Sequence, residues 1–144
     1  MPGWPSDVRV LERGWLSSNN ILLFDEQQHA AILVDTGYLS HAEQTLALVE
    51  QALDGRRLIS VVNTHLHSDH CGGNAALQQR YGVPIQVPEA EFDAANTWDE
   101  TRLTFRATGQ RCARFTPSQV LSPGGFIEVG SRRWDILGAP GHDP

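Results

Sequence analysis

The segment Thr64-His65-Leu66-His67-Ser68-Asp69-His70-Cys71-Gly72-Gly73-Asn74 decides how this sequence is interpreted. It places three imidazoles and one carboxylate within six residues, directly after an apolar run that is rich in β-branched side chains. Solvated histidines need no such clustering, whereas imidazole nitrogen and carboxylate oxygen are ligands that Zn²⁺ favours. The segment therefore predicts a metal site on a loop that follows a buried strand.

The spacing within the segment indicates how its side chains are shared between positions. His65 and His67, two residues apart in a near-extended loop, are expected to point to the same side and to bind one ion. Asp69 and His70 come after the chain has turned, so we expect them to face a neighbouring position. His142, which follows a Pro-Gly turn after an apolar strand, could supply a third nitrogen to the first ion. The predicted metal ligands are His65, His67, Asp69, His70 and His142.

Patterns on both sides of this segment predict an α/β sheet packed by helices. Aliphatic runs at 19–24 and 30–34, separated by five polar residues, predict a β-hairpin. Residues 40–53 predict a helix, with capping-box spacing at Ser40 and Glu43, one apolar face and Gly55 just beyond its end. The remaining expectations are a strand at 58–62, a polar loop at 65–73, a helix at 74–81, a strand at 84–87, a short helix and an exposed excursion within 89–110, an extended segment at 111–121, and a second hairpin at 126–129 and 132–137.

Composition limits the class of protein. The 144 residues suffice for one domain, and hydrophobic and charged fractions of 40% and 19% are typical of a soluble globular protein. A net charge of −6 disfavours nonspecific binding to nucleic acid or to an anionic membrane. No apolar run is long enough for a membrane span, no secretory signal is visible at the start, and two cysteines are too few for a disulfide framework. These features predict a cytoplasmic protein.

Three motifs in a fixed order resemble the N-terminal half of the metallo-β-lactamase superfamily. They are Val34-Asp35-Thr36-Gly37, the histidine-rich segment quoted above, and Ala139-Pro140-Gly141-His142. Together they extend the resemblance over essentially the whole chain. The middle motif is specific, whereas the first and last gain weight from their order and spacing.

The resemblance implies a four-layer αββα sandwich with a metal site at the edge of two sheets. It implies that His65, His67 and His142 bind one metal, while Asp69 and His70 contribute to a second. For Asp35 two interpretations stay open. It could order the ligand loop from beside the site, or it could be only a turn-forming residue after a strand.

In this superfamily the second metal is completed by a bridging Asp or Cys and a further His, both downstream of the position that His142 occupies. We therefore expect residues 1–144 to be a metallo-β-lactamase-like domain that is truncated just after its third metal motif. The alternative is a domain with an incomplete second site. His29 and His41 are weaker candidates for additional ligands, because one falls in a hairpin loop and the other near a helix start.

The expected function is metal-dependent hydrolysis, in which a metal-activated hydroxide attacks an acyl substrate such as a thioester or a lactone. Asp69 would hold the second metal and orient the nucleophile, and Cys71 would be a small packing residue. The metal would be zinc, as one or two ions, although iron and manganese also suit these ligands. His67 argues against the diiron flavoprotein branch, which carries Glu there; the motif is similar to the glyoxalase II-like and lactonase branches.

The predicted partners are a small-molecule substrate, with no nucleic acid and no membrane. The competing hypothesis is a non-catalytic metal-binding half-domain. An isolated half of the sandwich would expose the apolar sheet face that its second half covers, and would self-associate through that face.

Overall fold

The fold is described from a computed structural model of the chain. It describes residues 7–11, 20–37, 41–64, 66, 68–100, 103, 112–122, 124–129 and 132–136. No helix in these ranges is long and apolar enough to cross a membrane.

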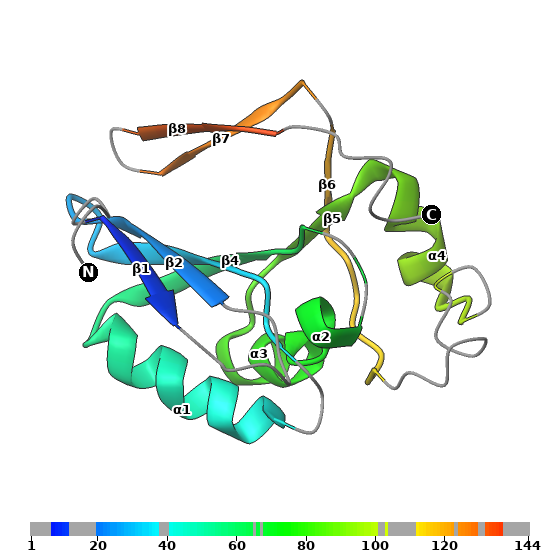
Figure 1. The fold of residues 1–144 in the computed structure, drawn as a ribbon, viewed down its shortest axis with the longest axis horizontal. Helices are drawn as coiled ribbons and strands as arrows, with labels where there is room; N and C mark the ends of the chain where they lie inside the picture. The colour runs from blue at the N-terminus through cyan, green and yellow to red at the C-terminus, as the bar shows by residue number, and fades with distance from the viewer. Residues whose placement is uncertain are drawn as a thin grey trace.

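Six strands form the central sheet, in the order β1-β2-β3-β4-β5-β6 (Figure 1). The first three strands are antiparallel neighbours, and the remaining pairs are parallel. Two further strands, β7 and β8, pair as a separate antiparallel hairpin. The strands are β1 (Val8–Leu11), β2 (Asn20–Asp25), β3 (Ala30–Val34), β4 (Arg57–Val62), β5 (Ile85–Pro88), β6 (Gln119–Leu121), β7 (Phe126–Val129) and β8 (Arg132–Asp135).

Helices lie on one face of the six-stranded sheet, and the β7–β8 hairpin lies on the other (Figure 1). Parallel neighbours need crossover connections, and helical segments provide them between β3 and β4, between β4 and β5, and between β5 and β6. The helices are α1 (Ala42–Leu53), α2 (Ser68–Cys71), α3 (Asn74–Tyr81), the 3₁₀ turn η2 (Glu89–Glu91) and α4 (Phe92–Thr97).

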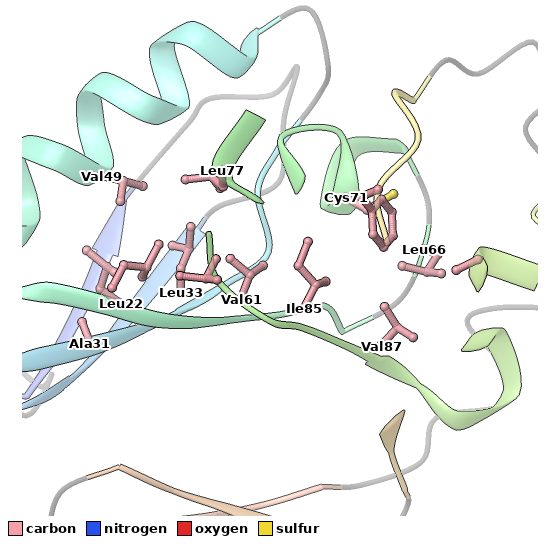
Figure 2. Close-up of a cluster of buried hydrophobic side chains, with 14 of the residues drawn as sticks. Leu22, Ala31, Leu33, Val49, Val61, Leu66, Cys71, Leu77, Ile85 and Val87 are labelled. Carbon is pink, nitrogen blue, oxygen red and sulfur yellow. The ribbon is translucent and has the colours of Figure 1, made fainter. Parts of the chain in front are cut away.

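Successive side chains of each strand point to opposite faces, so the sheet feeds two separate apolar clusters. On the helical face, Val49 of α1 and Leu77 of α3 pack with Leu22, Leu33 and Val61 of the sheet (Figure 2). On the other face, the hairpin covers a smaller cluster. Its buried members are Val8, Leu23, Ile32, Val62, Leu121 and Val129.

Most predicted elements are confirmed, within one or two residues at their ends. The first hairpin, the strand at 58–62, the helix at 74–81, the strand at 84–87 and the second hairpin all form. Helix α1 also forms, two residues later than predicted, and its N-cap is His41, which makes no side-chain capping bond. The predicted capping box between Ser40 and Glu43 stays a prediction. Ser40 itself lies outside the described residues.

The predicted polar loop at 65–73 is also corrected. Residues Ser68–Cys71 wind into the short helix α2, and Leu66 is buried in the helical-face core. The apolar side chains of Leu66 and Cys71 both pack inward, into the helical-face cluster. The segment is therefore anchored by its own apolar residues and is more than a solvated loop.

Candidate metal centre

The predicted metal segment starts at the carboxyl end of β4, beside the turn that follows β3. Because β3 and β4 run parallel, both of these connections leave the same edge of the sheet. The backbone N–H of Asp35 donates to the carbonyl of Val62 over 2.8 Å, which joins the two strand ends. Ligand sites in open α/β sheets typically occupy this edge.

The carboxylate of Asp35 makes several polar contacts at this edge of the sheet. Its backbone is left-handed, with φ of 61°, and the residue is only 5% exposed. Its carboxylate accepts from the Thr64 backbone N–H at 2.9 Å and from the Thr64 hydroxyl at 2.7 Å. Oδ2 also lies 2.8 Å from Nδ1 of His70. Asp35 is thus a turn residue whose carboxylate also holds Thr64 and His70, so it is more than a turn-forming residue.

His70 is held at its backbone as well as at its ring. Its carbonyl accepts from the Thr36 backbone N–H at 2.8 Å and from Asn63 Nδ2 at 3.2 Å. With Asp35 holding the ring, three residues at the strand ends fix both parts of His70. This fixes side-chain direction before any ligand binds, which is the main requirement of a precise metal site.

Three fully buried polar side chains tie the segment into the core: Thr36, Asn63 and Asn74. Asn74 Nδ2 donates to Asn63 Oδ1 at 2.6 Å, and the Thr36 hydroxyl donates to Asn74 Oδ1 at 2.8 Å. The carbonyl of Thr36 accepts in turn from the hydroxyl of Thr45 in α1, at 3.2 Å. Buried polar groups are stable only when they are hydrogen-bonded, so these contacts specify one arrangement of the loop.

Gly73 allows the segment to approach the turn after β3. A Cβ atom at residue 73 would lie 2.6 Å from the Thr36 carbonyl oxygen, a separation that real Cβ atoms essentially never show. The backbone N–H of Gly73 donates to the Thr36 hydroxyl at 3.0 Å. The φ of −91° is open to any residue, so the glycine serves close packing here and not an unusual backbone angle.

Only part of the predicted ligand set can be placed. His70 lies at the edge described above, and the backbone of Asp69 precedes it in α2. His65, His67 and His142 lie outside the described residues, as does the side chain of Asp69. Within the described ranges, no three His, Cys, Asp or Glu side chains gather as a metal-binding group. The five-ligand assignment therefore stays a prediction.

The His70 environment fits a metal ligand. A carboxylate only accepts hydrogen bonds, so the contact with Asp35 places the ring proton on Nδ1. With that proton in place, a neutral ring would carry its lone pair on Nε2, the form in which imidazole binds a metal. A ligating histidine commonly donates its other nitrogen to a carboxylate in this way. The donor chemistry of the segment, imidazole with carboxylate, suits Zn²⁺.

His29 does not belong to this edge. It lies in the β2–β3 turn with φ of 54°, at the opposite end of β3 from Asp35. The intervening strand of five residues spans roughly 15 Å. His41 caps α1, and its carbonyl accepts from the Thr45 hydroxyl at 3.1 Å.

The pKa shifts that are resolved lie away from the predicted centre. Near the β2–β3 turn, the Arg56 guanidinium donates to Glu26 and lowers the pKa of that exposed carboxyl. The same hydrogen bond raises the pKa of Arg56. At the end of α3, burial raises the pKa of Tyr81. None of these groups contacts the Asp35–His70 pair.

Sequence reasoning missed the polar residues that support the segment. Thr36, Thr45 and Asn63 were not singled out, although each is fully buried. A usable signal existed for two of them, because Asn63 directly follows one predicted strand and Thr36 lies two residues beyond the other, where polar residues start the connection at the site edge. Nothing in the sequence marked Thr45, which looks like an ordinary helix residue.

The sequence matches known proteins over nearly all of its length. The family model described as "Metallo-beta-lactamase superfamily" matches residues 13–144. An uncharacterized protein of Aquifex aeolicus is 28% identical over 95% of this chain and 61% of its own length. A protein named hydroxyacylglutathione hydrolase from Synechococcus sp. is 31% identical over 84% of this chain and 38% of its own length. A second hydroxyacylglutathione hydrolase, from Trichormus variabilis, is 29% identical over 94% of this chain and 44% of its own length.

Solved structures share the fold. A class B3 di-zinc metallo-beta-lactamase, LRA-12 from an Alaskan soil metagenome, superposes with a TM-score of 0.78 at 20% identity, covering 95% of this chain and 51% of that one. A metallo-beta-lactamase of Cronobacter sakazakii superposes with a TM-score of 0.75 at 21% identity, covering 96% of this chain and 52% of that one. The chain thus spans about half the length of these structures and of the curated hydroxyacylglutathione hydrolases that it matches. At these identities the structures establish the fold, which is the predicted metallo-β-lactamase type.

Proposed function

Because the chain belongs to the metallo-beta-lactamase superfamily, we propose that it forms the metal-binding part of a metal-dependent hydrolase. The observation that carries the proposal is the Asp35–His70 contact of 2.8 Å, set on a loop that buried polar residues hold in place. A surface histidine needs neither a buried carboxylate partner nor such support. The domain would comprise residues 1–144, and the activity would belong to the whole protein.

The residues proposed to hold the metal are His65, His67, Asp69, His70 and His142. Zinc bound among them would supply a water that is acidic enough to attack at neutral pH and a positive charge that polarises the substrate oxygen. Within this chain, Asp35 keeps the proton of His70 on Nδ1 and fixes the direction of its ring. Asp69 is the proposed catalytic carboxylate, which orients the attacking water and accepts its proton.

An acyl substrate, and in particular a thioester, is the proposed substrate class. Its support is that several relatives, at 26–31% identity, carry the name hydroxyacylglutathione hydrolase. The motif itself is shared by lactonases, β-lactamases and nuclease members of the superfamily, so it does not choose the substrate by itself. A small-molecule substrate is consistent with the net charge of −6, which disfavours nucleic acid.

Loss of zinc from a single-ligand variant tests the metal site. We expect His67→Ala to lose most of its bound zinc in elemental analysis, with little change in circular dichroism, because the helical-face core forms from other residues. His29→Ala is the matched control, since it removes a histidine at the far end of β3. Unchanged zinc content in His67→Ala, or an equal loss in His29→Ala, would refute the assignment.

A second candidate is a metal-binding module without catalysis, which would self-associate through the hairpin-covered face. Phe126 of the hairpin, at 46% exposed, favours this candidate. Zinc titration with a thioester-hydrolysis assay distinguishes the two. Turnover that falls at least about a hundredfold in Asp69→Asn supports the hydrolase. One zinc per chain with no turnover, together with a dimer in light scattering, supports the module.

A further inference from the structure

The two cysteines of the chain meet although they are 41 positions apart in sequence. The Sγ atoms of Cys71 and Cys112 are 3.6 Å apart, and neither cysteine is in a disulfide. Cys112 also lies 3.5 Å from the carbonyl oxygen of Cys71. One cysteine ends α2, and the other begins the segment 112–118 that leads into β6. The fold thus brings together the only two thiols that the sequence contains.

The two thiols differ in exposure. Cys71 is fully buried and packs at the end of the helical-face cluster that also holds Leu66 and Val87 (Figure 2). Cys112 is partly exposed and packs against the margin of the same cluster. A reagent in solution therefore reaches Cys112 first, and Cys71 only through its partner.

Helix α2 and the segment 112–118, which carry the two cysteines, are each held in place by hydrogen bonds that do not involve the thiols. Thr36 and Asn63 hold α2 through the carbonyl of His70. The segment 112–118 exchanges two hydrogen bonds with α3, from Gln78 Nε2 to the Thr116 carbonyl at 2.8 Å and from the Thr116 N–H to Gln78 Oε1 at 3.0 Å. The nearness of the sulfurs is thus set by the fold on both sides. A disulfide of about 2.05 Å needs the sulfurs to approach by only about 1.5 Å.

We propose that Cys71 and Cys112 are a reversible redox pair, which closes to a disulfide by exchange with a low-molecular-weight disulfide. The sulfur of Cys112 attacks one sulfur of the small disulfide, forming a mixed disulfide and releasing one small thiol. The sulfur of Cys71 then attacks Cys112 Sγ, and the second small thiol leaves. The net change is two protein thiols and one small disulfide converted to one protein disulfide and two small thiols. A dithiol reductant reverses it.

The bridge would connect the helical turn that carries Asp69 and His70 to the strand β6 side of the sheet. No contact of Cys71 or Cys112 is required for the hydrolase proposal, so the two proposals fail independently. Closing a loop of 41 positions reduces the entropy of the unfolded chain, and we expect oxidation to raise the Tm by roughly 5–15 °C.

The test is incubation of the 144-residue chain with oxidised glutathione, followed by intact-mass measurement and peptide mapping. The expected product has lost two hydrogen atoms, carries no glutathione, and yields a linked peptide pair containing residues 71 and 112. Reduction with dithiothreitol should restore the starting mass. A chain that keeps both thiols, or that accumulates glutathione on Cys112 without closing, would overturn the proposal.

Single variants test the order of the two steps. Cys71→Ala should stop at the mixed disulfide on Cys112, whereas Cys112→Ser should leave Cys71 reduced because that thiol is buried. If Cys112→Ser takes up glutathione at Cys71 as fast as Cys71→Ala does at Cys112, the proposed entry point is wrong. Circular dichroism of each variant shows that it remains folded, and the mass of the unmutated chain decides the proposal even where one variant does not fold.

Discussion

The two faces of the six-stranded sheet are covered to different degrees. On the helical face, Leu22, Leu33, Val49, Val61 and Leu77 are all 0% exposed (Figure 2). On the hairpin face, several members of the cluster are only partly buried, and Phe126 of β7 is 46% exposed. The partly buried members are Ile21, Val34, Ile59, Ile127, Trp134 and Ile136.

The difference shows where this chain builds a rigid support. The turn after β3 and the metal segment are tied to each other and to α1 and α3 of the helical layer through Thr36, Thr45 and Asn74. The predicted metal centre therefore rests on the face that is fully packed. The hairpin face instead offers apolar surface, which suits a further layer of structure or a second molecule.

The largest expected loss of stability comes from removing a fully buried side chain on the helical face of the sheet. Leu33→Ala should lower the free energy of unfolding by about 3–5 kcal/mol, because its side chain is fully buried and leaves a cavity. Ile127→Ala on β7 removes a residue of similar size from the less covered face, so we expect a loss of about 1–2 kcal/mol. Urea unfolding followed by circular dichroism measures both. Equal losses would show that the two faces are equally important for stability.

The next effect comes from the buried polar contacts that join the metal segment to the packed face. Asn74→Ala leaves groups on Asn63 and Thr36 without their partner, which should cost about 2–3 kcal/mol in unfolding free energy. Asn96→Ala makes the same change at an exposed position of α4, and we expect it to change stability by less than about 0.5 kcal/mol. A cost for Asn74→Ala as small as that of its control would mean that the network does not stabilise the fold.

Neutralising the Asp35 carboxylate that contacts His70 should lower the affinity for zinc more than it lowers the free energy of unfolding. Asp35→Asn keeps the shape of the side chain but no longer holds the His70 proton on Nδ1, so zinc affinity should fall about 10–100-fold. Asp135→Asn makes the same change in the exposed pair of β8 with Arg133. Competition with a chromogenic chelator measures both affinities, and parallel losses would exclude a specific role for Asp35.

The smallest expected effect concerns the surface of the helical layer. Arg80 of α3 and Glu50 of α1 form an exposed ion pair of 2.8 Å. Arg80→Ala should lower the free energy of unfolding by less than about 1 kcal/mol, and less still at high salt, because water and ions screen the pair. Thermal unfolding at two salt concentrations measures this. A larger cost would mean that the two helices depend on charge as well as on apolar packing.

Regular elements were predicted well wherever one physical signal dominated. The apolar runs at 30–34 and 58–62 became β3 and β4, and the helix predicted at 74–81 became α3, which ends at Gly82 in the left-handed conformation. Helix α1 begins two residues later than predicted, and Thr45 inside it bonds to the carbonyls of Thr36 and His41. The turn of helix at Ser68–Cys71 was missed because four residues carry no periodic signal.

The sequence by itself determined the fold class, because hydrophobic periodicity is a local property. It also predicted imidazole and carboxylate metal ligands, and that assignment stays a prediction. Only the tertiary structure decided which residues support His70, since Asp35, Asn63 and Thr36 reach it across 35, 7 and 34 positions of chain. The contact between the sulfurs of Cys71 and Cys112 is likewise visible only in the tertiary structure. Such contacts follow from parallel strand pairing, which places distant strand ends at one edge and leaves no local pattern in the sequence.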